Sequence, residues 1–235
     1  MSVICPVINE ISPATSMLIR NKYIDVYRRA YFINKIYESG IKSIEIGSFR
    51  KYDNVLFGTR DVLSNVNRRV DASRSALVME IENTLKNVAC KQSIIPSVDQ
   101  LVYEIKEQKN IDEFLKHKIV AKQLGMKTKL ILPSDKVNLY KYTEPDYVEV
   151  RDLSNELLSI ADPSKIFLRT NNFNDVDTAL YNGVFNFSSS LLKTEDFLNT
   201  IDLITYIRGK LGFEIKVNLE KLKETQREMI DEFNW

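Results

Sequence analysis

Residues 33–49, INKIYESGIKSIEIGSF, contain one complete helix-to-strand step, and this step decides the fold. The segment before Gly40 carries apolar residues three and four positions apart, from Ile19 to Tyr37, which predicts one buried face of a helix. Gly40 stands where a helix commonly ends in a left-handed residue. After a short turn, residues 43–48 predict a buried strand with one carboxylate, Glu45, in its middle. Such a step is typical of α/β proteins.

The same kind of step recurs along the chain. Apolar runs that predict strands lie at residues 7–12, 43–48, 76–81, 100–105, 129–132, 147–153, 165–170 and 184–188. Because helical segments separate them, we expect parallel strands joined by right-handed crossovers. Eight units in 235 residues predict an α/β fold, a single (β/α)8 TIM barrel over residues 1–235. We expect the eighth helix to begin at Thr194, and an extra C-terminal helix at about 218–235 to pack outside the barrel.

The composition excludes several classes of function. A net charge of +1 provides no field that attracts nucleic acid or an anionic membrane, so we expect neither as a partner. No apolar run approaches the length of a membrane span, and the first residues lack the features of a signal peptide, which predicts a cytoplasmic protein. The chain has only seven glycines and no GxGxxG or Walker-type loop, so nucleotide binding by those routes is excluded.

The cysteines and the histidine exclude further kinds of site. Cys5 and Cys90 are far apart and form no CxxC motif, so we expect reduced thiols. His117 is the only histidine, which excludes a metal site built on a histidine pair and disfavours a Ser-His-Asp triad. Its position opposite the apolar stripe of its helix predicts a solvent-facing side chain.

Carboxylates recur at the ends of the predicted strands, which is where a TIM barrel binds its ligands. Four strands carry a glutamate near that end: Glu10, Glu45, Glu80 and Glu104. One interpretation is an acidic cup for a cation or for acid–base chemistry. The other is a set of ion pairs with Arg151, Arg169 and neighbouring cations, and we favour it because alternate strand residues point away from the barrel interior.

Four segments of the chain carry a family resemblance. Residues 7–13 (VINEISP) and 33–49 resemble the first two barrel units of hydroxymethylglutaryl-CoA (HMG-CoA) lyase. Residues 192–197 (LKTEDF) and 217–222 (VNLEKL) resemble its ATED-containing and VNLQKL segments. That enzyme belongs to the metal-dependent TIM-barrel lyases related to pyruvate carboxyltransferases. The resemblance implies the same barrel along the whole chain.

The residues that carry the family's chemistry are replaced. The family holds a divalent cation, Mg²⁺ or Mn²⁺, with the Asp of an SPRDGLQ-type motif, two His on strand seven and an Asn before the ATED-like helix. Here Thr15 stands at the Asp position, Ala14 at the preceding catalytic Arg, Leu191 at the Asn, and residues 167–171 contain no histidine. The glycine-rich loop with the catalytic Cys is also missing. The resemblance therefore implies a degenerate member that has lost its metal cofactor, and with it the Lewis acid.

We therefore expect a catalytically inactive homologue with a binding or structural role. The alternative is a re-tooled, metal-free enzyme of lyase or aldolase type that acts on a small acidic or acyl substrate. Its candidate catalytic residues are Glu45, Asp152 and Arg169, of which Arg169 is suited to hold a carboxylate. Candidate ligand-binding residues at the barrel mouth are Ser12, Thr15, Ser48, Asn171 and Ser188. A small acidic ligand and a second copy of the chain are the partners that we expect.

Overall fold

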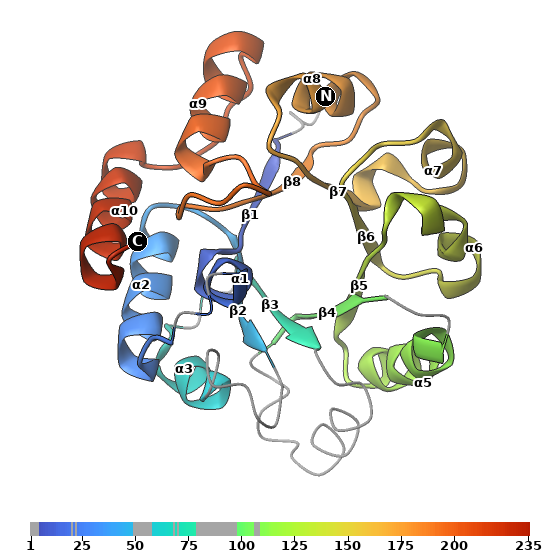
Figure 1. The fold of residues 1–235 in the computed structure, drawn as a ribbon, viewed down its shortest axis with the longest axis horizontal. Helices are drawn as coiled ribbons and strands as arrows, with labels where there is room; N and C mark the ends of the chain where they lie inside the picture. Colours follow the sequence, from blue (N-terminus) through green and yellow to red (C-terminus); the bar gives the residue numbers. More distant parts are fainter. Residues whose placement is uncertain are drawn as a thin grey trace.

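The structure is a computed structural model, and it describes residues 5–19, 21, 23–48, 58–67, 69, 71–78, 98–105 and 109–235. Eight parallel strands close into a barrel in chain order, and helices surround it (Figure 1). The predicted (β/α)8 barrel is confirmed. The strands are β1 Val7–Glu10, β2 Ser43–Ser48, β3 Ser73–Val78, β4 Gln100–Glu104, β5 Lys127–Ile131, β6 Tyr147–Val150, β7 Ile166–Arg169 and β8 Asn186–Ser189.

Helices and helical turns connect the strands. The α-helices are α1 Met17–Ile19, α2 Val26–Glu38, α3 Thr59–Asn65, α5 Lys109–Gln123, α6 Tyr140–Thr143, α7 Asn155–Ile160, α8 Phe173–Tyr181, α9 Thr200–Leu211 and α10 Leu219–Phe233. A π-helical turn, η1 (Ser12–Ser16), follows β1, and the 3₁₀ turns η3 (Ser134–Leu139) and η4 (Pro163–Lys165) precede α6 and β7. Among the described residues, no helix combines the length and apolarity that crossing a membrane requires.

Two helices begin later than the sequence predicts. α2 starts at Val26 because the Asp25 side chain accepts hydrogen bonds from the backbone of Tyr27 and Arg28 and so caps the helix there. Ile19 belongs to the separate turn α1. α9 starts at Thr200 instead of following Thr194, because Asn199 provides the cap. The end of α2 is as predicted, with Gly40 at a φ of 101°.

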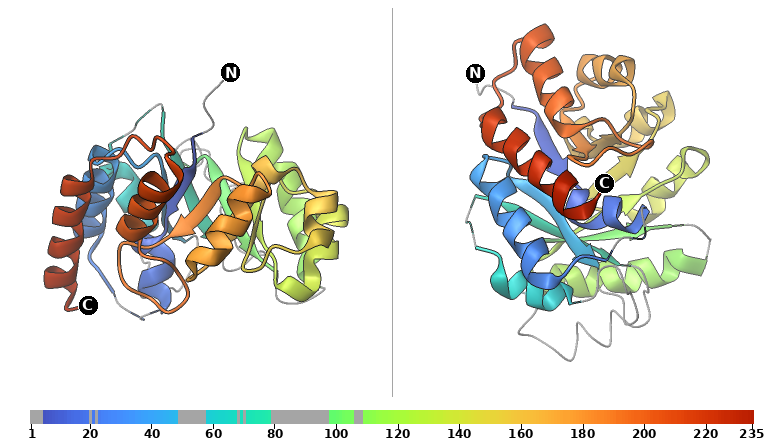
Figure 2. Two further views of the ribbon diagram at one scale, coloured as in Figure 1. Left: turned by 90° about the horizontal axis from the view of Figure 1, so that it is seen from above. Right: turned by 60° about the vertical axis from the view of Figure 1, so that its left-hand side comes forward.

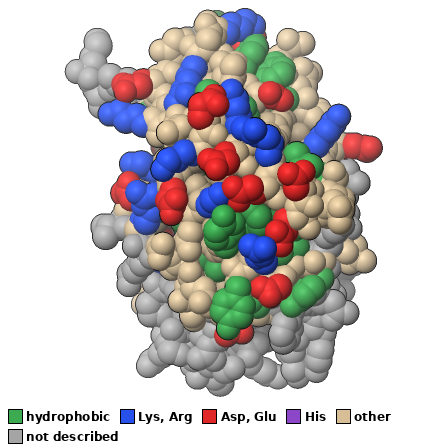
Figure 3. All heavy atoms as spheres, turned by 90° about the vertical axis from the view of Figure 1, so that its left-hand side faces the viewer, with side chains coloured by type: hydrophobic (Ala, Val, Ile, Leu, Met, Phe, Trp, Pro, Cys, Tyr) green, Lys and Arg blue, Asp and Glu red, His purple; other side chains and the backbone are tan. Residues whose placement is uncertain are grey.

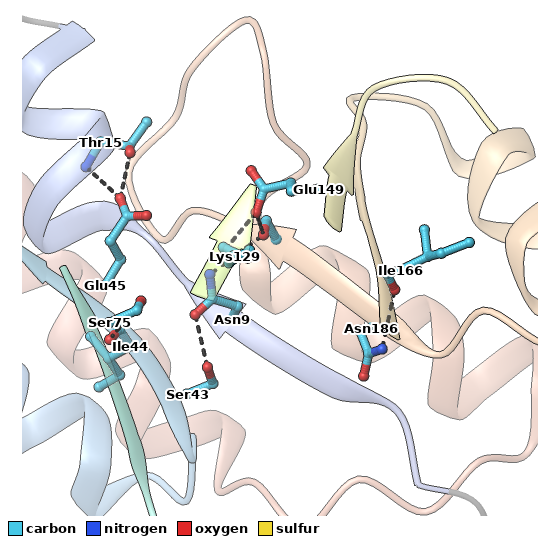
Figure 4. Close-up of polar contacts among 11 residues, drawn as sticks. Asn9, Thr15, Ser43, Ile44, Glu45, Ser75, Lys129, Glu149, Ile166 and Asn186 are labelled. Atoms are coloured by element: carbon cyan, nitrogen blue, oxygen red, sulfur yellow. Dashed lines mark hydrogen bonds and ion pairs between the residues drawn. The ribbon is translucent and has the colours of Figure 1, made fainter. Parts of the chain in front are cut away.

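The strands present mostly apolar side chains to the helices, and polar side chains gather inside the barrel beside Phe167. Ile44, Val148 and Leu168 alternate with the interior residues and are fully or almost fully buried under the helices. Inside the barrel, Ser43 Oγ donates to Asn9 Oδ1 over 2.8 Å, between β2 and β1 (Figure 4). The core therefore has two parts, an apolar layer between strands and helices and a polar column along the barrel axis.

The C-terminal helix α10 packs outside the barrel against α2, as predicted (Figure 2). The rings of Phe32 and Phe233 meet edge to face with their centroids 5.0 Å apart. At the rim of this contact, Arg28 pairs with Glu232 over 2.9 Å. On the face that contains these helices, basic and acidic side chains are interspersed, so it offers no large patch of a single sign (Figure 3).

Candidate functional site

Four ionisable side chains from four strands meet inside the barrel, and we call them the interior charge cluster. They are Glu45 of β2, Lys129 of β5, Glu149 of β6 and Arg169 of β7. Lys129 Nζ lies 2.7 Å from Glu149 Oε2, and neither side chain is more than 4% exposed (Figure 4). The pair is therefore a salt bridge sealed from water.

The strand pattern explains why this pair points inward. Thr128 and Leu130 flank Lys129 on β5 and face the helices, so the period-two alternation directs the lysine to the barrel axis. There its ammonium group lies 4.9 Å from the centroid of the Phe167 ring. Glu149 also accepts a hydrogen bond of 2.6 Å from Ser188 Oγ of β8. The lysine, the carboxylate and the serine thus link three strands across the interior.

The two carboxyl groups of the cluster differ in their environments. Burial raises the pKa of Glu45, although Lys129 and a hydrogen bond from Thr15 oppose the shift. Both the backbone N–H and the hydroxyl of Thr15 donate to Glu45 Oε1 (Figure 4). For Glu149, burial also acts to raise the pKa, but Lys129, Arg169 and the bond from Ser188 outweigh it and lower the pKa. Glu149 is therefore the ionised partner and Glu45 the group that more readily holds a proton.

Arg169 is the member of this cluster that is most exposed to solvent. Its side chain is 11% exposed, and its guanidinium group stands 4.2 Å from the centroid of the Phe197 ring. Asp196, at 4.0 Å from Nη2, also pairs with the exposed Arg151 at 3.1 Å. The Nε of Arg169 is buried, and no described residue accepts a hydrogen bond from it. A buried donor without an acceptor is costly, so this atom is suited to an acceptor that a ligand brings.

A second set of polar residues, Glu10, Ser12, Ser190 and Thr200, fixes the segment that follows β8, and we call it the Glu10 network. Glu10 Oε1 accepts from the backbone N–H of Ser12 (2.9 Å) and of Leu191 (3.0 Å), and also from the Ser12 hydroxyl. Glu10 Oε2 accepts from the Thr200 hydroxyl at the start of α9. Ser190 Oγ lies 3.1 Å from Ser12 Oγ. This carboxylate therefore holds β1, η1, the post-β8 loop and α9 together.

The remaining predicted site residues are spread over the mouth. Ser12 belongs to the Glu10 network, and Ser48 is buried, with its backbone N–H 3.2 Å from Thr59 Oγ1. Asn171 is exposed and donates to the carbonyl of Glu195 over 2.7 Å. Asp152 is exposed and accepts from Ser134. Of the predicted residues, the structure thus brings Glu45, Thr15, Arg169 and Ser188 to the interior charge cluster and leaves Asp152 and Asn171 apart.

The three predicted glutamates that the structure describes do not form one acidic cup. Glu45 faces the interior, Glu10 lies in its own network, Glu104 is exposed, and Glu80 lies outside the described residues. His117 is buried instead of solvent-facing, because its ring packs edge to face 5.7 Å from that of Tyr103 between α5 and β4. Cys5 is exposed, and Cys90 lies outside the described residues.

Sequence reasoning missed Lys129 and Glu149. A signal for them exists, because each is a charged residue inside a largely buried strand, KTKLI and YVEV, where a dry core does not tolerate an unpaired charge. That the two residues pair depends on the register of β5 against β6, which aligns Lys129 with Tyr147 and Ile131 with Glu149. This stagger lets the long lysine side chain reach up to the carboxylate.

The described residues of the mouth offer few ligands to a divalent cation. Within the described part of the chain, no group of three or more His, Cys, Asp or Glu side chains is placed to hold a metal ion. Thr15 donates to Glu45 from both its backbone and its hydroxyl, and Leu191 is apolar and fully buried. Lys129 and Arg169 add two positive charges next to the only carboxylates of the cluster. Hard cations need several oxygen ligands together, and within the described part of the chain this cluster contains two carboxylates, Glu45 and Glu149.

Comparisons with known proteins give a likeness in structure. No protein-family model and no curated protein sequence matches the chain. An HMG-CoA lyase from Bacillus subtilis matches with a TM-score of 0.81 at 18% identity, over 98% of this chain and 94% of that one. The lyase from Brucella melitensis matches with a TM-score of 0.83 at 13% identity, over 98% and 99%. One from Acinetobacter baumannii, in complex with coenzyme A and 3-methylmalate, gives 0.79 at 15%, over 98% and 92%. The chain therefore has an HMG-CoA lyase-like barrel fold.

Proposed function

We propose that this chain is a catalytically inactive relative of the HMG-CoA lyases whose barrel mouth binds a small carboxylate without a metal ion. The observation that carries the proposal is the position of Arg169 and Lys129. These two cations point toward the barrel axis from β7 and β5, and both act on the carboxyl groups of Glu45 and Glu149. Positive charges at this depth repel a divalent cation and attract an anion.

The positions that hold the family's metal support the first half of the proposal. Thr15 stands where the resemblance places a ligand Asp, and its hydroxyl is engaged by Glu45. Leu191 stands at the Asn position, where its side chain is fully buried and its backbone N–H is bound to Glu10. A cation would have to break both arrangements to gain ligands. Without a Lewis acid, the enolate that forms in carbon–carbon cleavage loses several kcal/mol of stabilisation.

The guanidinium of Arg169 supports the second half. It combines a buried Nε that lacks a hydrogen-bond partner among the described residues with a half-buried acidic neighbour, Asp196, 4.0 Å from Nη2. A planar guanidinium binds a carboxylate through two parallel hydrogen bonds, which Asp196 at 4.0 Å does not provide. A small carboxylate at the barrel mouth would satisfy this donor.

Two measurements on the purified protein test the proposal. We expect no cleavage of HMG-CoA with added Mg²⁺ or Mn²⁺, and no stoichiometric divalent metal by elemental analysis after dialysis against the same ions. A known HMG-CoA lyase treated identically is the positive control. Cleavage that depends on a bound divalent ion would refute the proposal outright.

A further inference from the structure

We propose that Lys129 captures the carbonyl group of a small 2-oxo acid as an imine. The proposal rests on the carboxylate-binding role of Arg169 and goes beyond it by naming a reactive group and a ligand class. Its basis is the juxtaposition, inside one barrel, of a primary amine, a carboxylate 2.7 Å from that amine, and a guanidinium whose Nε has no acceptor among the residues that the structure describes. Nucleophilic lysines form such imines when a base beside them can take their proton.

The geometry gives each group a part in this step. Glu149 Oε2 accepts a hydrogen bond from the Lys129 ammonium and is held by Ser188, so it is placed to take a proton from Nζ. Arg169 lies on β7, which pairs with the strand β6 that carries Glu149, and it is placed to hold the ligand carboxylate. Glu45, held by Thr15, faces the same interior as a carboxyl that retains a proton more readily than Glu149 does. The ligand that these groups match carries a carboxylate beside a carbonyl.

The step balances without any oxidant or reductant. Glu149 takes one proton from the ammonium, and the free amine of Lys129 attacks the carbonyl carbon to form the C–N bond. The attacking nitrogen then gives one of its two remaining protons to the carbonyl oxygen, which becomes the hydroxyl of a neutral carbinolamine. The hydroxyl then leaves as water with the proton that Glu149 returns, and the product is a protonated imine. In total, an ammonium and a ketone give an iminium and one water molecule.

The burial of Lys129 limits what can react. Its side chain is fully buried, whereas Arg169 retains 11% exposure on the rim side. We infer that a ligand approaches from the side of Arg169, the more exposed of the two cations, and it must be small enough to reach Nζ beside the Phe167 ring. We expect capture of pyruvate to be slow and larger 2-oxo acids to react less.

Borohydride trapping tests the inference. The full-length protein is incubated with pyruvate and sodium borohydride, and the adduct is located by peptide mass spectrometry. We expect a single reduced adduct per chain on Lys129. Lys129→Arg, which keeps a positive charge beside Glu149, should abolish it. Lys127→Arg is the matched control, because Lys127 lies on the same strand but is exposed and bound to the Tyr147 hydroxyl, and it should leave the adduct unchanged.

The outcomes separate this inference from the proposed function. Lactate has the carboxylate without the carbonyl, so it should bind at Arg169 and slow the trapping of pyruvate. If lactate binds but pyruvate gives no adduct on Lys129, or only scattered adducts on surface lysines, the inference is overturned and carboxylate binding stands. If neither lactate nor pyruvate binds, both the imine inference and the proposed carboxylate binding are overturned. Should Lys129→Arg fail to fold, the mapped position of the adduct in the unmodified protein decides the question.

Discussion

Lys129 Nζ lies 2.7 Å from Glu149 Oε2 on the barrel axis, where the two side chains are 0% and 4% exposed. Each charge has lost its hydration, so the intact pair adds little to stability even though its attraction is strong. Each charge nevertheless depends on the other for its stability in the interior. Removing either one leaves the other buried without a compensating charge, which destabilises the fold. This relationship distinguishes the barrel interior from the charged surface of α10.

Replacing Glu149 by Gln should destabilise the protein by about 3–5 kcal/mol, since it leaves the Lys129 ammonium unpaired in the interior. Urea unfolding followed by circular dichroism measures the effect. The matched control is Glu220→Gln, which removes an equivalent partner from Lys223 on the exposed face of α10 and should have no measurable effect. Equal losses of unfolding free energy in Glu149→Gln and Glu220→Gln would contradict the dependence of the buried lysine on its partner.

The pH dependence of stability should report on Glu45. Burial raises its pKa above the ordinary value of 4.5, so the folded state holds this proton more tightly than the unfolded state. The associated stability is complete below about pH 4.5 and is lost as the pH rises through the folded-state pKa. Glu45→Gln does not titrate and keeps an acceptor for Thr15, so its stability relative to the unmodified protein should increase with pH across this window.

Denaturation midpoints at a series of pH values from 4.5 upward check this expectation. Glu10 also has a pKa raised by burial, but it is present in both proteins and its contribution cancels in the difference. Parallel pH profiles for the two proteins would mean that Glu45 titrates as it does in the unfolded chain.

The Glu10 network should be sensitive to the loss of one hydroxyl. Thr200→Val removes the donor to Glu10 Oε2 at a fully buried position, which should cost about 1–3 kcal/mol of unfolding free energy. Thr205→Val on the same helix is the control, because its exposed hydroxyl donates only to the carbonyl of Ile201. If Thr205→Val loses as much unfolding free energy as Thr200→Val, then the hydrogen bond from Thr200 to Glu10 does not stabilise the segment after β8 in particular.

The architecture could be predicted from the sequence because it depends on local signals. The apolar periodicity before Gly40 and the run at residues 43–48 are sufficient to identify one unit, and their repetition predicts the closed barrel. The residues at which the helices begin could not be predicted as well. The side chains of both Asp25 and Thr194 suit a helix start, and only the fold reveals that Asp25 caps α2 whereas Asn199, not Thr194, caps α9.

The candidate site could be predicted only in part. Arg169 ends β7, where ligand sites of TIM barrels are expected, and Glu45 lies in the middle of β2; both belong to the interior charge cluster. Lys129 and Glu149 were not predicted as site residues. Their pairing depends on the stagger between β5 and β6, which the sequence of neither strand specifies by itself. Glu10 looked like a mouth carboxylate, but alternation along β1 turns it toward α9.

Titration calorimetry with lactate tests the central claim, metal-independent carboxylate binding at Arg169, most directly. We expect the same affinity in a chelator and in Mg²⁺. Arg169→Gln should weaken binding by about tenfold or more, the loss expected for a charge-assisted hydrogen bond. Arg151→Gln, which removes the exposed arginine that shares Asp196, should leave the affinity unchanged. Binding that requires Mg²⁺, or that survives Arg169→Gln intact, would contradict the account.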